Sequence, residues 1–187
     1  MVSTSESVRA EFVRYKALAE AGFAQVDESG LCTRPSATDN SIAVIVWHIS
    51  GNLESRFTDF LTSDGEKPWR HRDEEFLERT TTRTALMAKW QRGWDVAIGA
   101  LSGLTDADLG RTVTIRGQAL QVNQALHRAL AHVAYHVGQI VFVGKLLRGQ
   151  DWTSLSIPLG QSEAYNRAPG LEGAADHAQK LSKEGKG

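Results

Sequence analysis

The sequence predicts an all-α protein built as a four-helix bundle. Four long segments place apolar side chains three and four residues apart, which is the spacing of one face of an α-helix. The segments are roughly 20 to 25 residues long, a length that suits a bundle helix. With 187 residues, 41% of them hydrophobic, the chain can bury one sizeable core without staples.

The first two helices are expected over residues 3–26 and 41–61. The apolar stripe of the first consists of Val8, Phe12, Tyr15, Ala19, Phe23 and Val26. The second follows the sequence TDN, in which Asp39 or Asn40 can accept hydrogen bonds from the free backbone N–H groups of a helix start. It is expected to end before SDGEKP, because that stretch is rich in turn-forming residues.

The third and fourth helices are expected over residues 81–101 and 123–147, with Asn123 as a cap. The stripe of the third helix consists of Leu86, Trp90, Trp94, Ala97 and Leu101. Between these helices lies TVTIRGQALQV, in which two β-branched runs flank Arg-Gly-Gln. Because Gly117 can adopt a positive φ, this segment predicts a short hairpin-like connector.

The chain is expected to form one bundle domain over residues 1–168, followed by a tail over residues 169–187. The sequence WTSLSIPLGQSEAYNRAP is irregular but carries apolar side chains, so we expect it to pack back on the bundle. The last stretch, GLEGAADHAQKLSKEGKG, is small and polar and predicts a mobile tail.

Composition argues against several classes of partner. The formal net charge is −1, from 21 basic and 22 acidic side chains, so no nucleic acid and no anionic membrane is expected as a partner, although a locally basic patch is compatible with this balance. Other features of the sequence concern the cellular compartment. The single cysteine, Cys32, cannot form an internal disulfide, which fits a reducing compartment. The N-terminal sequence lacks the apolar core of a signal peptide, and the longest apolar run is too short to span a bilayer. We therefore expect a cytoplasmic protein.

Two histidines interrupt the apolar sequence RALAHVAYHVGQIVFVGKLL of the fourth helix. Each helical residue advances about 100°, so His132 and His136 share one stripe, and small alanines precede them on that side. On a regular helix His127 lies about 140° away and cannot join them. The remaining candidate is His48, which lies among apolar residues of the second helix.

The three histidines can be explained either as metal ligands or as structural residues of the bundle. Three imidazoles converging in a bundle would bind zinc or nickel well, because borderline metals favour nitrogen ligands. The alternative is a set of neutral imidazoles that are hydrogen-bonded inside the bundle or at its rim. The protease pattern H-E-x-x-H, the G-x-S-x-G motif and the Walker loop are all absent.

A polar stripe accompanies His48 on the second helix. Asn52, Ser55 and Asp59 share its side, which suits either the wall of a wet cavity or a solvated face. Asn52, Arg56 and Asp59 are the candidates for substrate binding. Arg56 lies about 80° from His48, where it could reach an anionic group but more simply covers the bundle surface. The following loop, DGEKPWRHRDEEF, is a candidate lid or dimer contact, and an ordinary solvated loop is the simpler interpretation.

These residues together resemble the DinB/YfiT-like superfamily of bacterial four-helix-bundle metalloenzymes. The pattern is a histidine in the second helix and H-x₃-H in the fourth, after a hairpin-like connector. NSIAVIVWHISGNLESRFTDFLTSDGEKPWRHRDEEF and LSIPLGQSEAYN resemble one branch of it, and the resemblance covers roughly residues 5–168. It implies His48, His132 and His136 as metal ligands, an up-down-down-up connection of the helices, and a homodimer.

The resemblance also implies a range of activities. The superfamily includes S-transferases that use bacillithiol or mycothiol, a thiol-dependent isomerase, and metal-dependent hydrolases. The expected function is therefore that of a metal-dependent transferase or hydrolase acting on a small molecule, with a low-molecular-weight thiol as a candidate cosubstrate. The histidine triad alone does not select among these activities. A metal-binding or stress-related protein without turnover, and a structural bundle without metal, are the alternatives.

Overall fold

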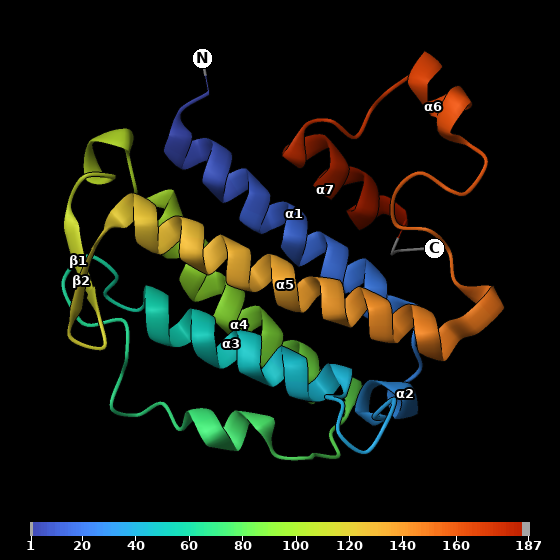
Figure 1. Cartoon of the computed structure of the whole chain (residues 1–187), viewed down its shortest axis with the longest axis horizontal. Coiled ribbons are helices and arrows are strands. Elements are labelled where there is room, and N and C mark those ends of the chain that lie inside the picture. Colours follow the sequence, from blue (N-terminus) through green and yellow to red (C-terminus); the bar gives the residue numbers. More distant parts are fainter. Residues whose placement is uncertain (1, 185–187) are drawn as a thin grey trace.

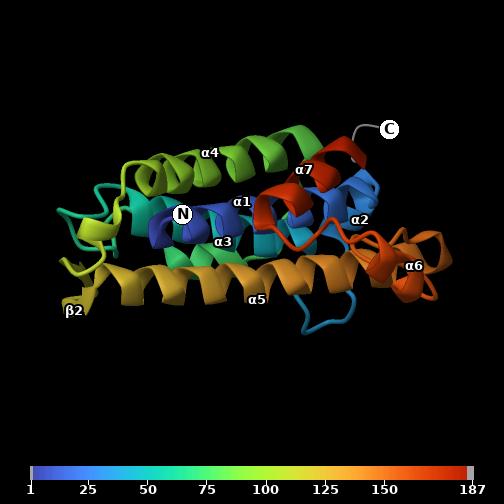
Figure 2. The ribbon, with the colours of Figure 1, turned by 90° about the horizontal axis from the view of Figure 1, so that it is seen from above.

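Four long helices form the body of the computed structural model, which describes residues 2–184 (Figures 1 and 2). They are α1 (Thr4–Ala24), α3 (Ile42–Phe57), α4 (Arg83–Ser102) and α5 (Val122–Arg148). Each coincides with a segment of helical periodicity, so the predicted all-α bundle is confirmed.

The long helices run in an up-down-down-up order. Figure 1 shows α1 and α5 running in one direction and α3 and α4 in the other. Gln25, just after α1, exchanges hydrogen bonds with the backbone of Thr153, just after α5, at 2.8 and 3.0 Å. Arg83 at the start of α4 donates to the carbonyl oxygen of Phe23 near the end of α1 at 3.1 Å. These contacts confirm the order of helix directions that the resemblance implies.

Shorter elements connect or cover the long helices. They are α2 (Glu28–Cys32), η1 (Arg72–Phe76), η2 (Asp106–Asp108), η3 (Gly149–Asp151), α6 (Ser162–Arg167) and α7 (Ala174–Glu184). The long connector between α3 and α4 contains η1, which packs against α3. This connector therefore places the side chains of η1 beside the bundle core.

A two-stranded hairpin precedes α5, as predicted. Its strands are β1 (Thr112–Ile115) and β2 (Gln118–Gln121), which pair antiparallel. Arg116 and Gly117 form the turn with φ of 55° and 72°. The carboxylate of Asp64 accepts hydrogen bonds from both of their backbone N–H groups at 2.8 Å. The hairpin is thereby fastened to the connector that follows α3.

Large side chains fill the space between the helices. The largest fully buried ones include Phe12, Phe23, Ile49, Leu53, Leu86, Trp90, Trp94, Leu126 and Ile140. The rings of Phe23 and Trp90 meet edge to face, with centroids 5.5 Å apart. Where α3 crosses α4, a Cβ on Gly93 would lie 2.8 Å from the Cα of Ser50. Glycine at this position thus permits the close approach of the two helices.

The ends of α3 and α5 differ in detail from the sequence-based expectation. The N-cap of α3 is Ser41, whose hydroxyl accepts from the N–H of Val44 at 3.3 Å, and not the preceding Asp-Asn pair. The helix ends at Phe57, before residue 61, because Thr58 is extended with ψ of 122°, and Asp59 then adopts a positive φ of 50°. The N-cap of α5 is Gln121, so Asn123 lies inside the helix and not at its cap.

The C-terminal segment contains a helix that packs on the bundle. Ala178 and Leu181 of α7 are 5% and 2% exposed and form a small apolar cluster with Ala17 and Ala21 of α1. The segment predicted as a polar tail therefore contributes buried side chains, because two of its few apolar residues lie on one face. The domain boundary at residue 168 and the mobility of the segment stay predictions.

One described segment, Val122–Asp151, is long and apolar enough to cross a membrane by length and composition. It is almost entirely α5, which packs against α1 and α3 and buries eight of its residues in the bundle. Core helices of bundles commonly meet the same criterion, so the finding is weak evidence for a membrane span.

Candidate metal site and adjoining cavity

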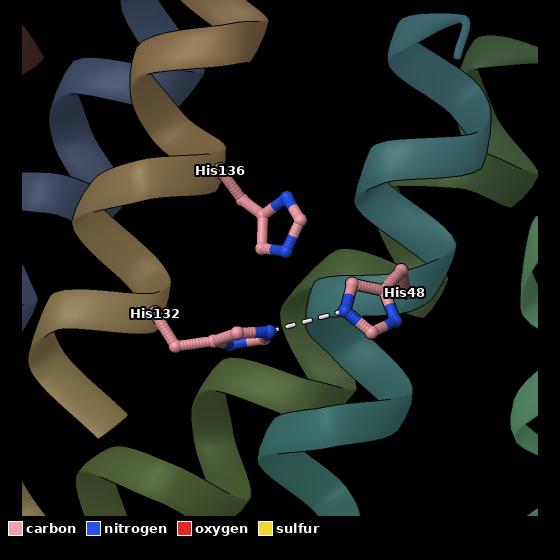
Figure 3. Close-up of side chains that lie close together, drawn as sticks. All are labelled: His48, His132 and His136. Carbon is pink, nitrogen blue, oxygen red and sulfur yellow. Dashed lines mark hydrogen bonds between the residues drawn. The ribbon is translucent and has the colours of Figure 1, made fainter. Parts of the chain in front are cut away.

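Three histidines from two facing helices converge inside the bundle (Figure 3). His48 comes from α3, and His132 and His136 come from successive turns of α5. One ring nitrogen of each lies within 4.8 Å of a ring nitrogen of the other two. The Nε2 atoms of His48 and His132 are 3.1 Å apart. The three side chains are therefore close enough to bind one metal ion.

Two of the imidazoles are oriented by hydrogen bonds from their outer nitrogen. Nδ1 of His48 lies 2.8 Å from Oε2 of Glu75, and Nδ1 of His136 lies 2.7 Å from Oε1 of Gln139. A carboxylate and an amide oxygen only accept hydrogen bonds, so each Nδ1 donates. Nε2 of each ring is then left to face the centre of the cluster (Figure 3). A carboxylate behind a metal-binding histidine commonly fixes both the tautomer and the orientation of the ring.

Glu75 is itself held by an arginine from the same connector. Nε and Nη2 of Arg70 donate to the two carboxylate oxygens of Glu75 at 2.8 and 2.9 Å. Burial alone would raise the pKa of Glu75, but the hydrogen bonds from His48 and Arg70 outweigh it and lower the pKa below its ordinary value. Glu75 is therefore an anion in the protein interior, and its two partners compensate the cost of burying that charge.

The approach of Glu75 to α3 requires a glycine. A Cβ built on Gly51 would lie 2.2 Å from Oε1 of Glu75, far inside any van der Waals contact. Gly51 follows His48 by almost one helical turn, so the gap that it leaves admits the carboxylate beside the histidine ring. The sequence HISG thus provides both the imidazole and the space for its partner.

Burial keeps the α5 histidines neutral. It lowers the pKa of His132 to about 3, and the neighbouring His136 and His48 add to this effect. Burial also lowers the pKa of His136, against a smaller opposing effect of the hydrogen bond to Gln139. Neutral imidazoles carry the lone pair that a metal needs, so His132 and His136 have the protonation state of metal ligands at neutral pH.

The donor set fits a divalent transition metal. Ligands bound at about 2.0–2.1 Å with tetrahedral angles are separated by about 3.3 Å, close to the 3.1 Å between Nε2 of His48 and His132. Nδ1 of His132 is buried without a hydrogen-bond partner among the described residues. The three imidazoles provide nitrogen ligands, whereas calcium and magnesium prefer oxygen ligands.

A cavity of about 490 Å³ adjoins the three histidines, and all three line it. Its apolar part includes the rings of Phe57, Phe60 and Phe76 and the side chains of Ile115 and Ala129. A volume of this size accommodates a small organic molecule. The cluster therefore lies in the wall of a space that a ligand can enter.

Five arginines line the same cavity: Arg56, Arg70, Arg72, Arg116 and Arg128. No Asp or Glu is among the lining residues in the part of the chain that the structure describes. The carboxylates that pair with these arginines are outside the lining: Glu66 pairs with two of them, Glu75 with a third and Asp73 with a fourth. The side of the cavity that faces a ligand is thus strongly basic.

The other sequence-predicted residues lie in different places. Asn52 and Arg56 line the cavity, whereas Asp59 is exposed, adopts a positive φ and is outside the lining. The role of all three in substrate binding stays a prediction. Of the histidines left out of the triad, His127 is exposed on α5, and His177 on α7 bonds to the carbonyl oxygen of Leu155 at 3.0 Å.

Sequence reasoning missed Glu75 and Arg70. Both lie in the stretch PWRHRDEEF, whose mixture of charges is typical of a solvated loop. In the sequence, nothing distinguishes the buried Arg70 and Glu75 from the exposed charged residues between them. Gln139, in contrast, lies one turn after His136 on the same stripe, so helical spacing could have identified it.

Comparison with known proteins gives the family and nothing finer. No curated protein matches the chain. One family model matches residues 3–161, which covers the four long helices, the hairpin and all three clustered histidines. The chain therefore belongs to the family described as "Protein of unknown function (DUF1572)".

Proposed function

We propose that this protein is a metal-dependent enzyme of the DinB/YfiT-like superfamily, which transfers a group of a small molecule to a thiol or to water. The observation that carries the proposal is the convergence of His48, His132 and His136 in the wall of a cavity of about 490 Å³. Catalytic zinc sites characteristically have three protein ligands, whereas structural zinc sites have four. The helix order and the H-x₃-H spacing support the assignment to the superfamily.

The residues around the cluster have distinct roles in this proposal. His48, His132 and His136 hold zinc or nickel, and a bound divalent metal supplies the Lewis acidity that activates a thiol or a water. Glu75 and Gln139 keep two of the imidazoles in the orientation that binding requires. The apolar part of the cavity excludes water from one side of the substrate, and Asn52 and Arg56 contact its polar groups.

The composition of the wall favours these reactions over proton abstraction by a carboxylate. Among the described residues that line the cavity, none offers a carboxylate as a general base, and Glu75 is engaged by His48 and Arg70. Transfer to a thiol or to water needs no such base when the nucleophile is activated at the metal site.

Metal content is the first test of the proposal. The protein is purified without a nickel column, and its zinc and nickel are measured before and after reconstitution. We expect about one ion per chain in the wild type and in His127→Ala, and none in His48→Ala or His132→Ala. Protein that takes up no stoichiometric metal, or a His48→Ala variant that keeps it, would show that the cluster is structural.

Turnover is the second test. The metal-loaded protein is offered bacillithiol, mycothiol or glutathione with electrophiles, and separately simple esters and amides. Activity that is lost in His132→Ala and kept in His127→Ala supports catalysis at this site, and the active substrate set distinguishes a thiol transferase from a hydrolase. Stoichiometric metal with no activity on any set would favour a metal-binding or stress-related protein without turnover.

We also propose that the protein is a cytoplasmic homodimer. Phe142 and Leu146 on the outer face of α5 are 67% and 55% exposed, and large exposed apolar side chains on one helix face favour association. Size-exclusion chromatography with light scattering gives the mass in solution. We expect twice the chain mass for the wild type and the chain mass for Phe142→Lys; a monomeric wild type would contradict the dimer.

A further inference from the structure

We infer that the cavity binds a small organic anion, in which a carboxylate or a phosphate is joined by a short spacer to an apolar body. This inference rests on the proposed function, because the ligand is taken to be the substrate of the metal site. The evidence for the inference is the set of side chains that line the cavity. The inference names a class of substrate, which the three histidines alone do not determine.

The cavity wall carries more positive charge than its neighbours neutralise. Arg56 and Arg116 share the single carboxylate of Glu66 at 3.1 and 2.9 Å. Nε of Arg70 pairs with Glu75 at 2.8 Å, but its Nη1 is buried and has no partner in the described chain.

The remaining two arginines, Arg72 and Arg128, are both exposed. Arg72 lies over the ring of Phe76 at 4.9 Å and, among the described residues, pairs only with the exposed Asp73 at 3.6 Å. Arg128 has no hydrogen bond or ion pair with any residue that the structure describes. Five guanidinium groups thus face three carboxylates, and the metal adds further positive charge. A bound anion would neutralise part of this excess positive charge.

Arg128 and Arg116 are the residues that we assign to anion binding. Arg128 has no competing partner within the described residues, and the guanidinium of Arg116 is 56% exposed and shares its carboxylate. Guanidinium groups bind carboxylates and phosphates with paired, charge-assisted hydrogen bonds, which are stronger than neutral ones. Arg56 and Arg70 are tied to the connector and hold its shape, so they are poor choices for a test.

Arg128 is attached to α5 one helical turn before His132, and both side chains line the cavity. Arg128 precedes His132 by four residues on α5, a rise of about 6 Å along the helix. A ligand whose anionic group contacts Arg128 therefore reaches the histidine cluster with a spacer of a few atoms. The rings of Phe57 and Phe60, with centroids 5.2 Å apart, lie in the same wall and suit an apolar body.

The test compares three probes of similar shape on the zinc-loaded protein by calorimetric titration. Phenylacetate and phenyl phosphate carry the proposed charge, and phenylacetamide is the neutral counterpart. We expect at least one anion to bind about tenfold more tightly than the amide, because a charge-assisted hydrogen bond contributes that much. The preferred anion identifies the class as carboxylate or phosphate. Equal binding of all three probes, or no binding, would overturn the inference.

Substitutions then assign the charge to the arginines. Arg128→Gln and Arg116→Gln should each weaken binding of the preferred anion about tenfold without altering the zinc content or the affinity for the amide. Arg92→Gln, on the exposed surface of α4 outside the cavity, is the matched control and should change neither. Unchanged anion affinity in both cavity variants would show that the arginines do not bind it.

Failure of the inference can be told apart from failure of the proposed function. The same titrations are repeated on protein stripped of metal. If the wild type binds zinc and the anion binds only through the metal, affinity disappears on stripping but survives both arginine substitutions, and the inference alone is wrong. If the wild type takes up no zinc, the proposed function fails whatever the probes do.

Discussion

At the scale of single residues, the carboxylate of Glu75 determines how well His48 can bind a metal. Glu75→Gln should lower zinc affinity about 10- to 100-fold, because the hydrogen bond that orients His48 and raises its basicity is weakened. Competition with a chromophoric chelator measures the affinity. Glu74→Gln changes an exposed neighbour and is the matched control. Equal affinities of the two variants would show that Glu75 serves only the packing of the connector.

Gly51 offers a second test at the same scale, because a single methyl group there would collide with Glu75. Gly51→Ala should lower stability by about 1–3 kcal/mol, the usual cost of overpacking, and should also weaken zinc binding by displacing the carboxylate. Gly138→Ala on α5 is the control, since nothing lies within 4 Å of the position that a Cβ would take there, and it should be neutral or slightly stabilising. Denaturant unfolding measures both; similar losses of stability would contradict the steric argument.

At the scale of elements, the hairpin depends on one carboxylate from a different connector. Backbone hydrogen bonds from Gly117 and Glu66 lower the pKa of Asp64 below its ordinary value of 3.8. A lowered pKa in the folded state means that the carboxylate stabilises the fold above the unfolded pKa and loses this effect as pH falls through the folded one. The protection factors of the hairpin amides, which compare each exchange rate with that of the unfolded peptide at the same pH, should therefore fall in acid, below about pH 4.

Substitution tests the same link at neutral pH. Asp64→Ala should lower the protection factors of residues 112–121 at neutral pH to the level that acid produces in the wild type, with no further fall in acid. Asp39→Ala, an exposed aspartate whose side chain makes no hydrogen bond in the described chain, is the control and should exchange as the wild type does. A hairpin that stays protected in Asp64→Ala would show that strand pairing alone stabilises it.

The elements also show how far sequence reasoning extends in this protein. Helix periodicity is local, so the four long helices and the common stripe of His132 and His136 follow from spacing alone. That His48 faces them depends on how α3 packs against α5, for which the family resemblance was needed. The position of Glu75 depends on the path of the whole connector 58–82, and no local rule fixes that path. A buried pair such as Arg70–Glu75 consequently looks like any solvated pair in the sequence.

The C-terminal helix illustrates a weaker signal at the same scale. Only Ala178 and Leu181 of α7 carry its apolar contact with α1, too few to stand out from a polar segment. Leu181→Ala should cost about 2 kcal/mol or less of stability and accelerate hydrogen exchange in α7, while zinc affinity stays that of the wild type. A loss of zinc binding in this variant would show that α7 supports the whole bundle and not only its own attachment.

At the scale of the whole molecule, the histidine cluster joins two antiparallel helices that belong to different halves of the sequence. A metal bound by His48 and by the two α5 histidines would link α3 to α5 in the folded protein, and the unfolded chain offers no such preformed site. Ligand that binds only the folded state stabilises it by an amount that grows with its concentration relative to Kd. The stability of this bundle should therefore depend on metal in a way that a structural bundle would not.

Thermal unfolding with and without zinc is the direct measurement of this dependence. Free zinc at 100 times Kd should add about 2.7 kcal/mol, which corresponds to a rise in Tm of roughly 5–10 °C for a chain of this size. A chelator should reverse the rise. The variant in which His48, His132 and His136 are all alanine should unfold at one temperature in both conditions, whereas His127→Ala should keep the full difference. A rise in Tm that persists in the triple variant would show that zinc binds at another site. The histidine cluster would then not link α3 to α5, because imidazoles that hold no ion cannot couple the two helices.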